Sequence, residues 1–462
     1  MIAPAPNRSS ERPTHVRWLI VLVLFMVTSL NYADRATLSI VGTDLSKKFG
    51  FDTVMMGYLL SAFSWAYVAA QIPGGWLLDR LGSKRVYGWS IGLWSFFTLL
   101  QGFVFVQGPS FTIPTLFWAP VVVSGSFLLL FGMRLLLGIA EAPAFPANSR
   151  IVASWFPAAE RGTAAAIFNS AQYGGTVIFS PIMGWITHSF GWQPVFWFMG
   201  AVGLVFAAAW SKLIHGPRQH PSANAAEVDL IRRGGGLVDL DQAGPATAKP
   251  AARPGLVFDL LKNRMLLGIF FGQYCINVLT WFFLTWFPIY LVKDRGMSIL
   301  KVGFVATLPA LCGFIGGVLG GWMSDRFLKR GLSLTVARKI PIVLGLLLST
   351  TIVACNYVET QWAVILFMSL SFFGKGVGAL GWAVMSDVAP KEATGLAGGL
   401  FNTFGNLAGI ITPIVIGYIL KSTGSFNGAL VYVGAHALLA VVSFLFIVGE
   451  IKRFELPPVG KR

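Results

Sequence analysis

Five ionisable side chains occur inside apolar segments that are long enough to cross a lipid bilayer: Asp34, Arg35, Arg134, Glu141 and Lys375. Burying one such group at the centre of a membrane helix costs about 2.5–3.5 kcal/mol on insertion scales, so each one needs a function or a partner. The set carries three positive and two negative charges. This excess of positive charge favours binding of an anion, and the two acids could carry protons.

The spacing of these residues limits how they can pair. Asp34 and Arg35 are adjacent, so on a helix they point about 100° apart and cannot face one partner in the same way. Arg134 and Glu141 are seven residues apart, which places them on one stripe but about 10 Å apart along the axis. We expect Arg134 to offset Asp34 or Glu141, leaving Arg35 and Lys375 free to meet an anion. Closed salt bridges that only orient helices are the alternative.

Coupling to protons requires a carboxylate that binds a proton when buried and releases it when a cation approaches. Asp34 and Glu141 are the candidates. We therefore expect protons to act as the coupling ion, and we expect no cofactor and no metal, because the three cysteines have no paired spacing.

Polar side chains also lie within the apolar segments. Amides both donate and accept hydrogen bonds, which suits hydroxyl groups of a polyol, but amides also bridge membrane helices, and both interpretations stay open. The candidates for lining a binding site are Tyr32, Tyr67, Asn169, Gln172, Gln273, Asn277, Trp382 and Asn402.

The elements that position these residues are predicted to be twelve membrane-spanning helices. The chain has 462 residues, of which 55% are hydrophobic and 12% charged, too apolar for the surface of a water-soluble protein. Segments near the ~20 residues of a spanning helix recur along it. They are residues 18–40, 54–78, 86–107, 121–149, 162–186, 192–211, 265–292, 300–324, 340–357, 361–386, 395–420 and 426–449.

An internal repeat divides the chain into two six-helix halves. Residues 75–85, which contain Asp79, Arg80, Lys84 and Arg85, are partly repeated at 321–326, where Asp325 and Arg326 stand. Parallel repeats place a pseudo-symmetry axis along the membrane normal and a substrate site between the halves. We expect these six charged residues to control gating, although charges that only set topology are the simpler alternative.

Charge placement predicts the topology. Of the 35 Lys and Arg residues, 26 lie in the termini and alternate loops, which places both termini in the cytoplasm. These charges are spread through short loops without interleaved aromatics, so the net charge of +16 does not indicate nucleic-acid binding. The predicted parts are a cytoplasmic tail at 1–17, helix bundles at 18–214 and 264–449, a cytoplasmic linker at 215–263 and a second tail at 450–462.

The loop at 75–85 resembles the best-known signature of the major facilitator superfamily. The segments 31–39, 63–67, 71–75, 141–146 and 155–157 resemble its anion:cation symporter family of sugar-acid carriers. The resemblance covers nearly the whole chain and implies the twelve-helix, two-bundle, all-α membrane fold. It further implies that Arg35 holds the substrate carboxylate and that Asp34 and Glu141 take protons, modulated by Arg134. The implied lining residues are Tyr32, Tyr67, Gln172, Gln273, Trp382 and Asn402.

The segments 373–382, 272–277 and 425–428 resemble the galactarate/D-glucarate transporters, and they depart from galactonate-type carriers by placing Lys375 where those have an amide. An added cation suits the second carboxylate of a diacid. This resemblance implies proton-coupled uptake of a sugar-acid anion by a monomer in the bacterial inner membrane. The alternatives are a galactonate- or hexuronate-type monoacid symporter, a proton-driven drug exporter and a membrane sensor that does not transport.

Overall fold

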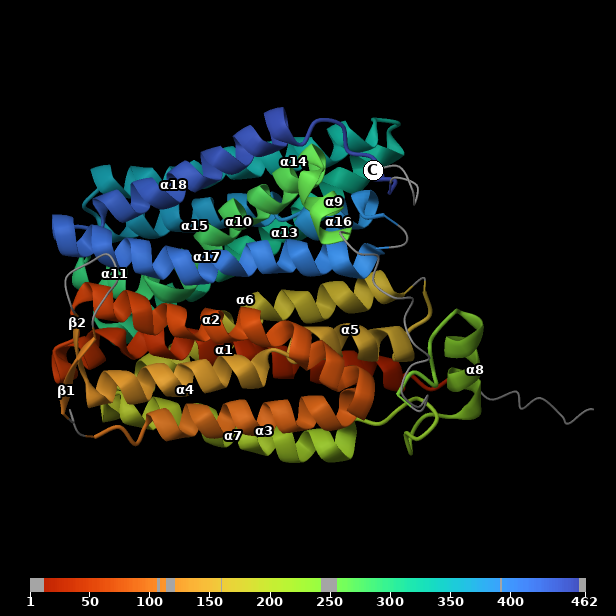
Figure 1. The fold of residues 1–462 in the computed structure, drawn as a ribbon, viewed down its shortest axis with the longest axis horizontal. Helices are drawn as coiled ribbons and strands as arrows, with labels where there is room; N and C mark the ends of the chain where they lie inside the picture. The colour runs from red at the N-terminus through yellow and green to blue at the C-terminus, as the bar shows by residue number, and fades with distance from the viewer. Residues whose placement is uncertain are drawn as a thin grey trace, which may run out of the picture.

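The structure is a computed structural model that describes residues 12–105, 109–113, 121–158, 160–241, 256–390 and 393–456. Its helices run roughly parallel to one another in two groups (Figure 1). The first group contains α1 (Val16–Phe49), α2 (Thr53–Leu81), α3 (Ser83–Gln101), α4 (Gly125–Glu141), α5 (Ala144–Trp155), α6 (Arg161–Phe190) and α7 (Gln193–Leu213).

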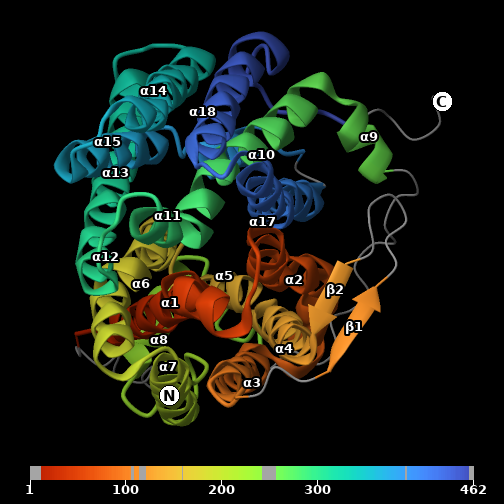
Figure 2. The same cartoon turned by 90° about the vertical axis from the view of Figure 1, so that its left-hand side faces the viewer.

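The second group begins after the linker. It contains α10 (Arg264–Thr285), α11 (Phe287–Lys293), α12 (Ile299–Val305), α13 (Thr307–Lys329), α14 (Leu334–Ser349), the 3-10 helix η1 (Thr350–Tyr357), α15 (Gln361–Val377), α16 (Gly381–Val388), α17 (Thr394–Thr423), α18 (Asn427–Val442) and the π-helical turn η3 (Ser443–Ile447). Seen end-on, the first group forms the lower half of the molecule and the second group the upper half (Figure 2).

The predicted all-helical membrane fold is confirmed. Each of the twelve predicted segments corresponds to one helix or to two consecutive helices. Within the described residues, ten helical stretches are long and apolar enough to cross a membrane, with mean hydropathies of 1.3 to 2.3. The two remaining segments are α3 and α6, and each packs closely against neighbouring spanning helices.

Several spanning segments are broken where proline or glycine interrupts the backbone hydrogen bonds. The fourth segment stops at Glu141 and restarts after Pro143, and the seventh restarts at Phe287 with Pro288 in its first turn. Proline has no N–H and removes one backbone hydrogen bond, so within a spanning segment it favours a kink or a break of the helix. The tenth segment breaks between Gly378 and Leu380.

One prediction about the fourth segment was wrong. Residues 121–124 form strand β2 (Val121–Ser124), which pairs antiparallel with β1 (Ser110–Ile113), and the helix begins only at Gly125. Consecutive valines favour extended backbone over helix, because their branched side chains restrict χ1. Ser124 then caps the helix by accepting a hydrogen bond from the Phe127 N–H, at 3.3 Å.

The two ends of the molecule carry different secondary-structure elements. The end with β1 and β2 is the hairpin end, and the opposite end, with α8 (Ala225–Arg233) and α9 (Leu256–Lys262), is the linker end (Figure 1). Helix α8 is docked against the first group by Glu227, which is fully buried. Its carboxylate accepts hydrogen bonds from Thr14, from the backbone N–H groups of Val16 and Arg17, and from the Arg17 guanidinium at 3.1 Å.

Candidate transport site

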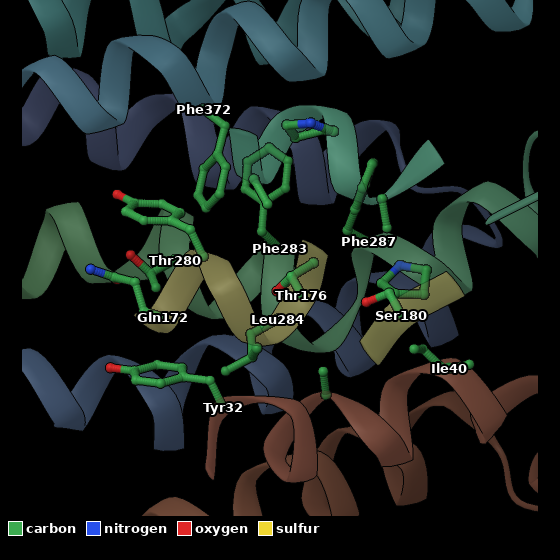
Figure 3. A pocket seen from close by; sticks show the side chains of 16 residues that line it. Tyr32, Ile40, Gln172, Thr176, Ser180, Thr280, Phe283, Leu284, Phe287 and Phe372 are labelled. Atoms are coloured by element: carbon green, nitrogen blue, oxygen red, sulfur yellow. The ribbon is translucent and has the colours of Figure 1, made fainter. Parts of the chain in front are cut away.

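A cavity lies between the two helix groups, near the middle of the molecule. Its wall comes from α1, α6, α10, α11, α13 and α15, and it encloses about 600 Å³ of empty space including its opening. Figure 3 shows Tyr32 on one side and Phe372 and Phe283 on the other. The polar members of the wall are Tyr32, Gln172, Tyr173, Thr176, Ser180 and Thr280.

Polar side chains lie along the length of the cavity. The side chains of Tyr32 and Gln172 lie toward one end of it, and those of Ile40 and Ser180 lie toward the other (Figure 3). Because α1 runs from the linker end to the hairpin end, the end of the cavity with Tyr32 faces the linker end. Hydroxyl and amide groups on an otherwise apolar wall are what a hydroxylated ligand needs for orientation.

At the hairpin end the two groups are held together. Lys421 of α17 pairs with Asp52 before α2 at 3.0 Å, and the Thr53 hydroxyl donates to the Gly417 carbonyl at 3.0 Å. The Ser39 hydroxyl of α1 also donates to the Thr285 carbonyl of α10, and within the second group the Trp286 indole donates to the Pro413 carbonyl at 3.1 Å. These bonds close the hairpin side of the cavity.

Glycine allows this close approach. A Cβ at Gly57 would lie 2.6 Å from the Pro413 carbonyl oxygen, and one at Gly417 would lie 2.6 Å from the Thr53 carbonyl oxygen. Both distances are shorter than side-chain atoms tolerate, so α2 and α17 can pack this tightly only with glycine at these positions.

Lys375 lies behind the aromatic wall of the cavity. It is only 3% exposed, and its Nζ lies 5.1 Å from the ring centre of Phe372 and 5.5 Å from that of Tyr173. Within the described residues, no acid and no hydrogen-bond acceptor pairs with it. A buried ammonium held only by ring faces keeps most of its capacity to bind an anion.

Arg35 is paired with an acid, although the sequence predicted that it is free to meet an anion. Its Nε donates to Glu141 Oε2 at 3.0 Å, and both side chains are buried. The guanidinium lies 4.6–4.9 Å from the ring centres of Tyr32, Phe63 and Tyr67. The expectation that Arg35 is free to meet an anion is therefore wrong for this conformation, because the α4 carboxylate is within reach of α1.

Asp34 and Arg134 also pair differently from the prediction. Arg134 donates to the backbone carbonyls of Asp34 and Arg35, each at 3.4 Å, rather than to a carboxylate. The carboxylate of Asp34 is buried and faces the Trp94 indole. Neither acid belongs to the wall of this cavity, and neither Arg35 nor Lys375 does, so this cavity is not the expected chamber shared by the cations and the acids.

Some of the other predicted lining residues lie on the cavity wall, and the rest lie away from it. Tyr32 and Gln172 line the cavity, and Tyr67 stacks on Phe63 beneath Arg35, with ring centres 5.2 Å apart. Gln273 and Asn277 of α10 pack against Gly405 of α17. The remaining predicted residues lie apart from the wall: Trp382 is 52% exposed and packs on Phe401, the Asn402 side chain accepts from Asn406 at 3.2 Å, and the Asn169 amide donates to the Ala165 carbonyl at 2.8 Å.

The family model of the Major Facilitator Superfamily matches residues 24–413. The chain belongs to this superfamily. Its fold is also similar to that of solved members. A D-xylose-proton symporter superposes with a TM-score of 0.69 at 16% identity, covering 94% of this chain and 98% of that one. A bacterial homologue of the human lysosomal transporter Spinster superposes with a TM-score of 0.65 at 16% identity, covering 94% and 95%.

Curated relatives are much closer in sequence. The probable galactarate/D-glucarate transporter GudP of Escherichia coli K12 is 60% identical over 98% of both chains. Its Bacillus subtilis namesake is 58% identical over 96% of this chain and 94% of that one. A D-galactonate transporter of Escherichia coli O6:H1 is 39% identical over 96% of this chain and 98% of that one.

The signature loop of this superfamily member forms an ion-pair network at the linker end. Asp79 pairs with Arg150 of α5 at 2.6 Å, and Arg150 also pairs with Asp241 of the linker at 3.2 Å. The Arg80 guanidinium lies 4.1 Å from the ring centre of Trp76. Lys84 and Arg85 begin α3, where Arg85 is exposed.

The repeated loop uses a different helix for its partner. Asp325 lies 3.7 Å from Arg338 of α14, and Arg338 pairs with Asp387 of α16 at 2.8 Å. Arg326 lies 5.7 Å from the ring centre of Trp322. Arg150 and Arg338 are not among the six gating residues predicted from the sequence, because neither belongs to the repeated motif.

Several wall residues were not predicted: Tyr173, Thr176, Ser180, Thr280, Phe283 and Phe372. Thr176 and Ser180 follow Gln172 at intervals of four, which is the spacing of one helix face. That spacing was a usable signal. The aromatic residues carry no comparable signal, because most aromatics in membrane helices serve packing.

Proposed function

We propose that this superfamily member carries galactarate, D-glucarate or a related six-carbon diacid into the bacterial cell together with protons. The observation that carries the proposal is the buried ammonium of Lys375 beside the central cavity, which pairs with no acid in the ranges that the structure describes. It occurs in a chain that is 57–60% identical to curated relatives named for these two diacids.

A diacid needs a cation for each of its two carboxylates. Lys375 supplies one from α15 in the second group, and Arg35 supplies the other from α1 in the first group. Binding both ends of one molecule draws the two groups together, which is the step that alternating access requires. The hydroxyls of Thr176 and Thr280 and the amide of Gln172 suit the sugar hydroxyls.

The Arg35–Glu141 pair supports a simple mechanism of proton coupling. When Glu141 takes up a proton its charge is lost, and the ion pair at 3.0 Å weakens. Arg35 is then released toward Tyr32, which lines the cavity, and can accept a substrate carboxylate. When the substrate leaves, Arg35 returns to Glu141 and favours loss of the proton. One site therefore binds a proton and an anion together.

The distribution of Lys and Arg supports a cytoplasmic linker end. On this orientation both termini are cytoplasmic, and the bonds between α2 and α17 close the opposite side. A cavity formed between the two groups of one chain supports function as a monomer.

The deciding experiment is counterflow in proteoliposomes loaded with galactarate. Labelled galactarate and D-glucarate should exchange, and an inwardly directed pH gradient should drive their accumulation. Galactonate and hexuronates are tested alongside, since preferential exchange of these monoacids would favour the monoacid symporter. Saturable binding of galactarate without any flux would instead identify a sensor and overturn the transport proposal.

A further inference from the structure

Helix α3 carries a stripe of polar and indole side chains that faces the interior of the first helix group. The members follow one another at intervals of three or four residues, which keeps them on one side of the helix. All are at most 2% exposed: Tyr87, Ser90, Trp94, Thr98 and Gln101. The stripe extends along nearly the whole of α3, an arrangement expected of a face in contact with water rather than of a buried one.

Two neighbouring spanning segments, α1 and the α4–α5 pair, carry similar polar stripes that face the same region. On α1 the residues are Thr28, Asn31 and Asp34, three apart, and along α4 and α5 they are Arg134, Glu141 and Asn148, seven apart. Each of these six residues is also at most 2% exposed. We call the three stripes together the polar column.

Side-chain contacts join the three stripes. The Asn148 amide donates to the Thr28 hydroxyl at 2.9 Å, and the Tyr87 hydroxyl lies beside both residues. Two turns further along α3, the Trp94 indole faces the Asp34 carboxylate, and the ring centres of Trp94 and Tyr87 are 6.2 Å apart. The column therefore links Asp34 to Tyr87 and Asn148.

Among the described residues, much of the hydrogen-bonding capacity of the column has no protein partner of ordinary geometry, although Tyr87 lies beside Thr28 and Asn148, Trp94 beside Asp34, and Asn31 beside Glu141. Leaving a buried polar atom unpaired costs about 1–3 kcal/mol, and such atoms in folded proteins are usually satisfied by internal water. The atoms without a partner of ordinary geometry are Tyr87 Oη, Trp94 Nε1, both carboxylate oxygens of Asp34, both amide atoms of Asn31, Glu141 Oε1, Asn148 Oδ1, Arg134 Nε, Thr98 Oγ1 and Gln101 Oε1.

We propose that the polar column holds a chain of internal waters that conducts protons between Asp34 and Glu141 and the linker end, through the Tyr87 hydroxyl and past the Asn148 amide, which orients the waters. This inference rests on the proton symport proposed above. Each transfer is balanced: one proton leaves a carboxyl group, each water or hydroxyl in turn accepts one proton and releases another, and one proton is delivered at the linker end.

The direction of the path follows from the position of Tyr87. It lies four residues after Ser83, about 6 Å along the axis, where α3 begins beside the Asp79–Arg150–Asp241 network. The charged groups that face the path are Arg134 and Glu141 around Asp34, Arg35 paired with Glu141 at 3.0 Å, and Glu141 near Tyr87. No residue of the column lines the central cavity, so protons and substrate take separate routes.

Water in the column can be tested without any transport assay. X-ray radiolysis forms hydroxyl radicals from water in place, and mass spectrometry measures the resulting oxidation. Trp94 and Trp155 form a matched pair, since each is at most 1% exposed in the same helix group, but the Trp155 indole is satisfied by the His215 carbonyl at 3.0 Å. Trp94 should oxidise several-fold faster than Trp155. Equally slow oxidation of both would overturn the water chain.

Conduction is tested in proteoliposomes that contain a pH-sensitive dye. Tyr87→Phe and Asn148→Leu should slow galactarate-driven proton uptake by roughly tenfold or more, as expected when a proton relay is lost. Galactarate counterflow at equal pH should stay within about twofold of the wild type, because neither residue lines the cavity. Tyr432→Phe is the matched control, since its hydroxyl is also buried without a partner but lies in the second helix group.

The outcomes separate the two proposals. Coupled proton uptake in the wild type that Tyr87→Phe and Asn148→Leu leave unchanged would overturn the column alone. If the wild-type protein exchanges galactarate without proton uptake, both proton symport and proton conduction through the column are overturned. The oxidation rate of Trp94 would then still report only whether the column contains water. Loss of counterflow in Tyr87→Phe and Asn148→Leu but not in Tyr432→Phe would overturn the separation of the two routes.

Discussion

Two buried cations, Arg35 and Lys375, have different partners. Arg35 is neutralised by Glu141 at 3.0 Å, whereas in the described part of the chain the ammonium of Lys375 lies against the ring faces of Phe372 and Tyr173 and meets no acid. A buried charge without a counter-ion is costly, so its retention is explained by a ligand that supplies the missing negative charge.

Replacing Lys375 with methionine should weaken diacids more than monoacids. Loss of one charge-assisted hydrogen bond costs about 1.5–3 kcal/mol, which is roughly 10- to 100-fold in Kd for galactarate. Titration calorimetry measures the Kd values of galactarate and galactonate for the wild type, Lys375→Met and the exposed control Lys452→Met. Equal losses on both ligands would contradict a role in binding the second carboxylate.

The same substitution should stabilise the unliganded protein. Removing a buried charge that has no counter-ion should raise the free energy of unfolding by about 1 kcal/mol or more. Thermal unfolding in detergent, followed by circular dichroism, checks this by a higher Tm for Lys375→Met than for the wild type. A lower Tm would indicate that Lys375 has a structural partner.

Replacing Glu141 with glutamine should uncouple transport from protons. The neutral amide cannot hold Arg35 as an ion pair and cannot exchange a proton, so accumulation driven by a pH gradient should be lost while counterflow persists. Proteoliposome uptake with and without a pH gradient measures both. Glu160→Gln, which alters the partly exposed pair with Arg17, serves as the control. Normal accumulation by Glu141→Gln would rule out this residue as the proton carrier.

At the scale of elements, α8 is tied to the first helix group through one carboxylate. Glu227 accepts both backbone N–H groups at the start of α1 and the Arg17 guanidinium, so it acts as the cap that His15 does not provide. A helix N-terminus needs such acceptors, because its first N–H groups have no partner within the helix.

Glu227→Ala should therefore destabilise the protein strongly. Arg17 would lose a buried partner and α1 would lose its cap, for a combined cost of about 3–5 kcal/mol. Glu160→Ala, which removes the more exposed of the two partners of Arg17, should cost at most about 1 kcal/mol. Thermal unfolding of both variants gives the comparison, and similar shifts in Tm would refute the assignment of Glu227 as the principal anchor.

At the scale of the whole molecule, the hairpin end is closed by contact of α2 with α17. The contact depends on Gly57 and Gly417, where any Cβ would collide with a backbone carbonyl. A single methyl group added at either position should therefore destabilise the closed arrangement. It should not destabilise a conformation of the transport cycle in which α2 and α17 are separated.

Gly57→Ala should shift the protein toward opening at the hairpin end. Spin labels at Lys48→Cys and Ser422→Cys, after replacement of the native cysteines, report the distance between the two groups by double electron–electron resonance. The variant should gain a population at longer distance. Gly132→Ala is the control, since a Cβ there meets nothing within 4 Å. An unchanged distance distribution in Gly57→Ala would show that the contact does not limit opening.

Much of the fold could be predicted from local properties of the chain. The twelve apolar segments follow from hydropathy, and the ion pair formed by Asp79 belongs to a motif that is visible in the sequence. Residues 121–124 were assigned wrongly, since an apolar run of valines satisfies hydropathy for a helix and for a strand alike. Arg150 and Arg338, the partners of Asp79 and Asp325, lie on other helices and have no motif of their own.

The amino-acid sequence alone determined that this protein is an all-helical membrane protein with five ionisable residues in its interior, because hydropathy and charge are properties of each segment by itself. Only the tertiary structure decided that Arg35 pairs with Glu141, that Lys375 meets no acid among the residues the structure describes, and that Asp34 and Glu141 do not line the cavity. These facts depend on distances of a few ångströms between helices, and such distances follow from packing rather than from spacing along the chain.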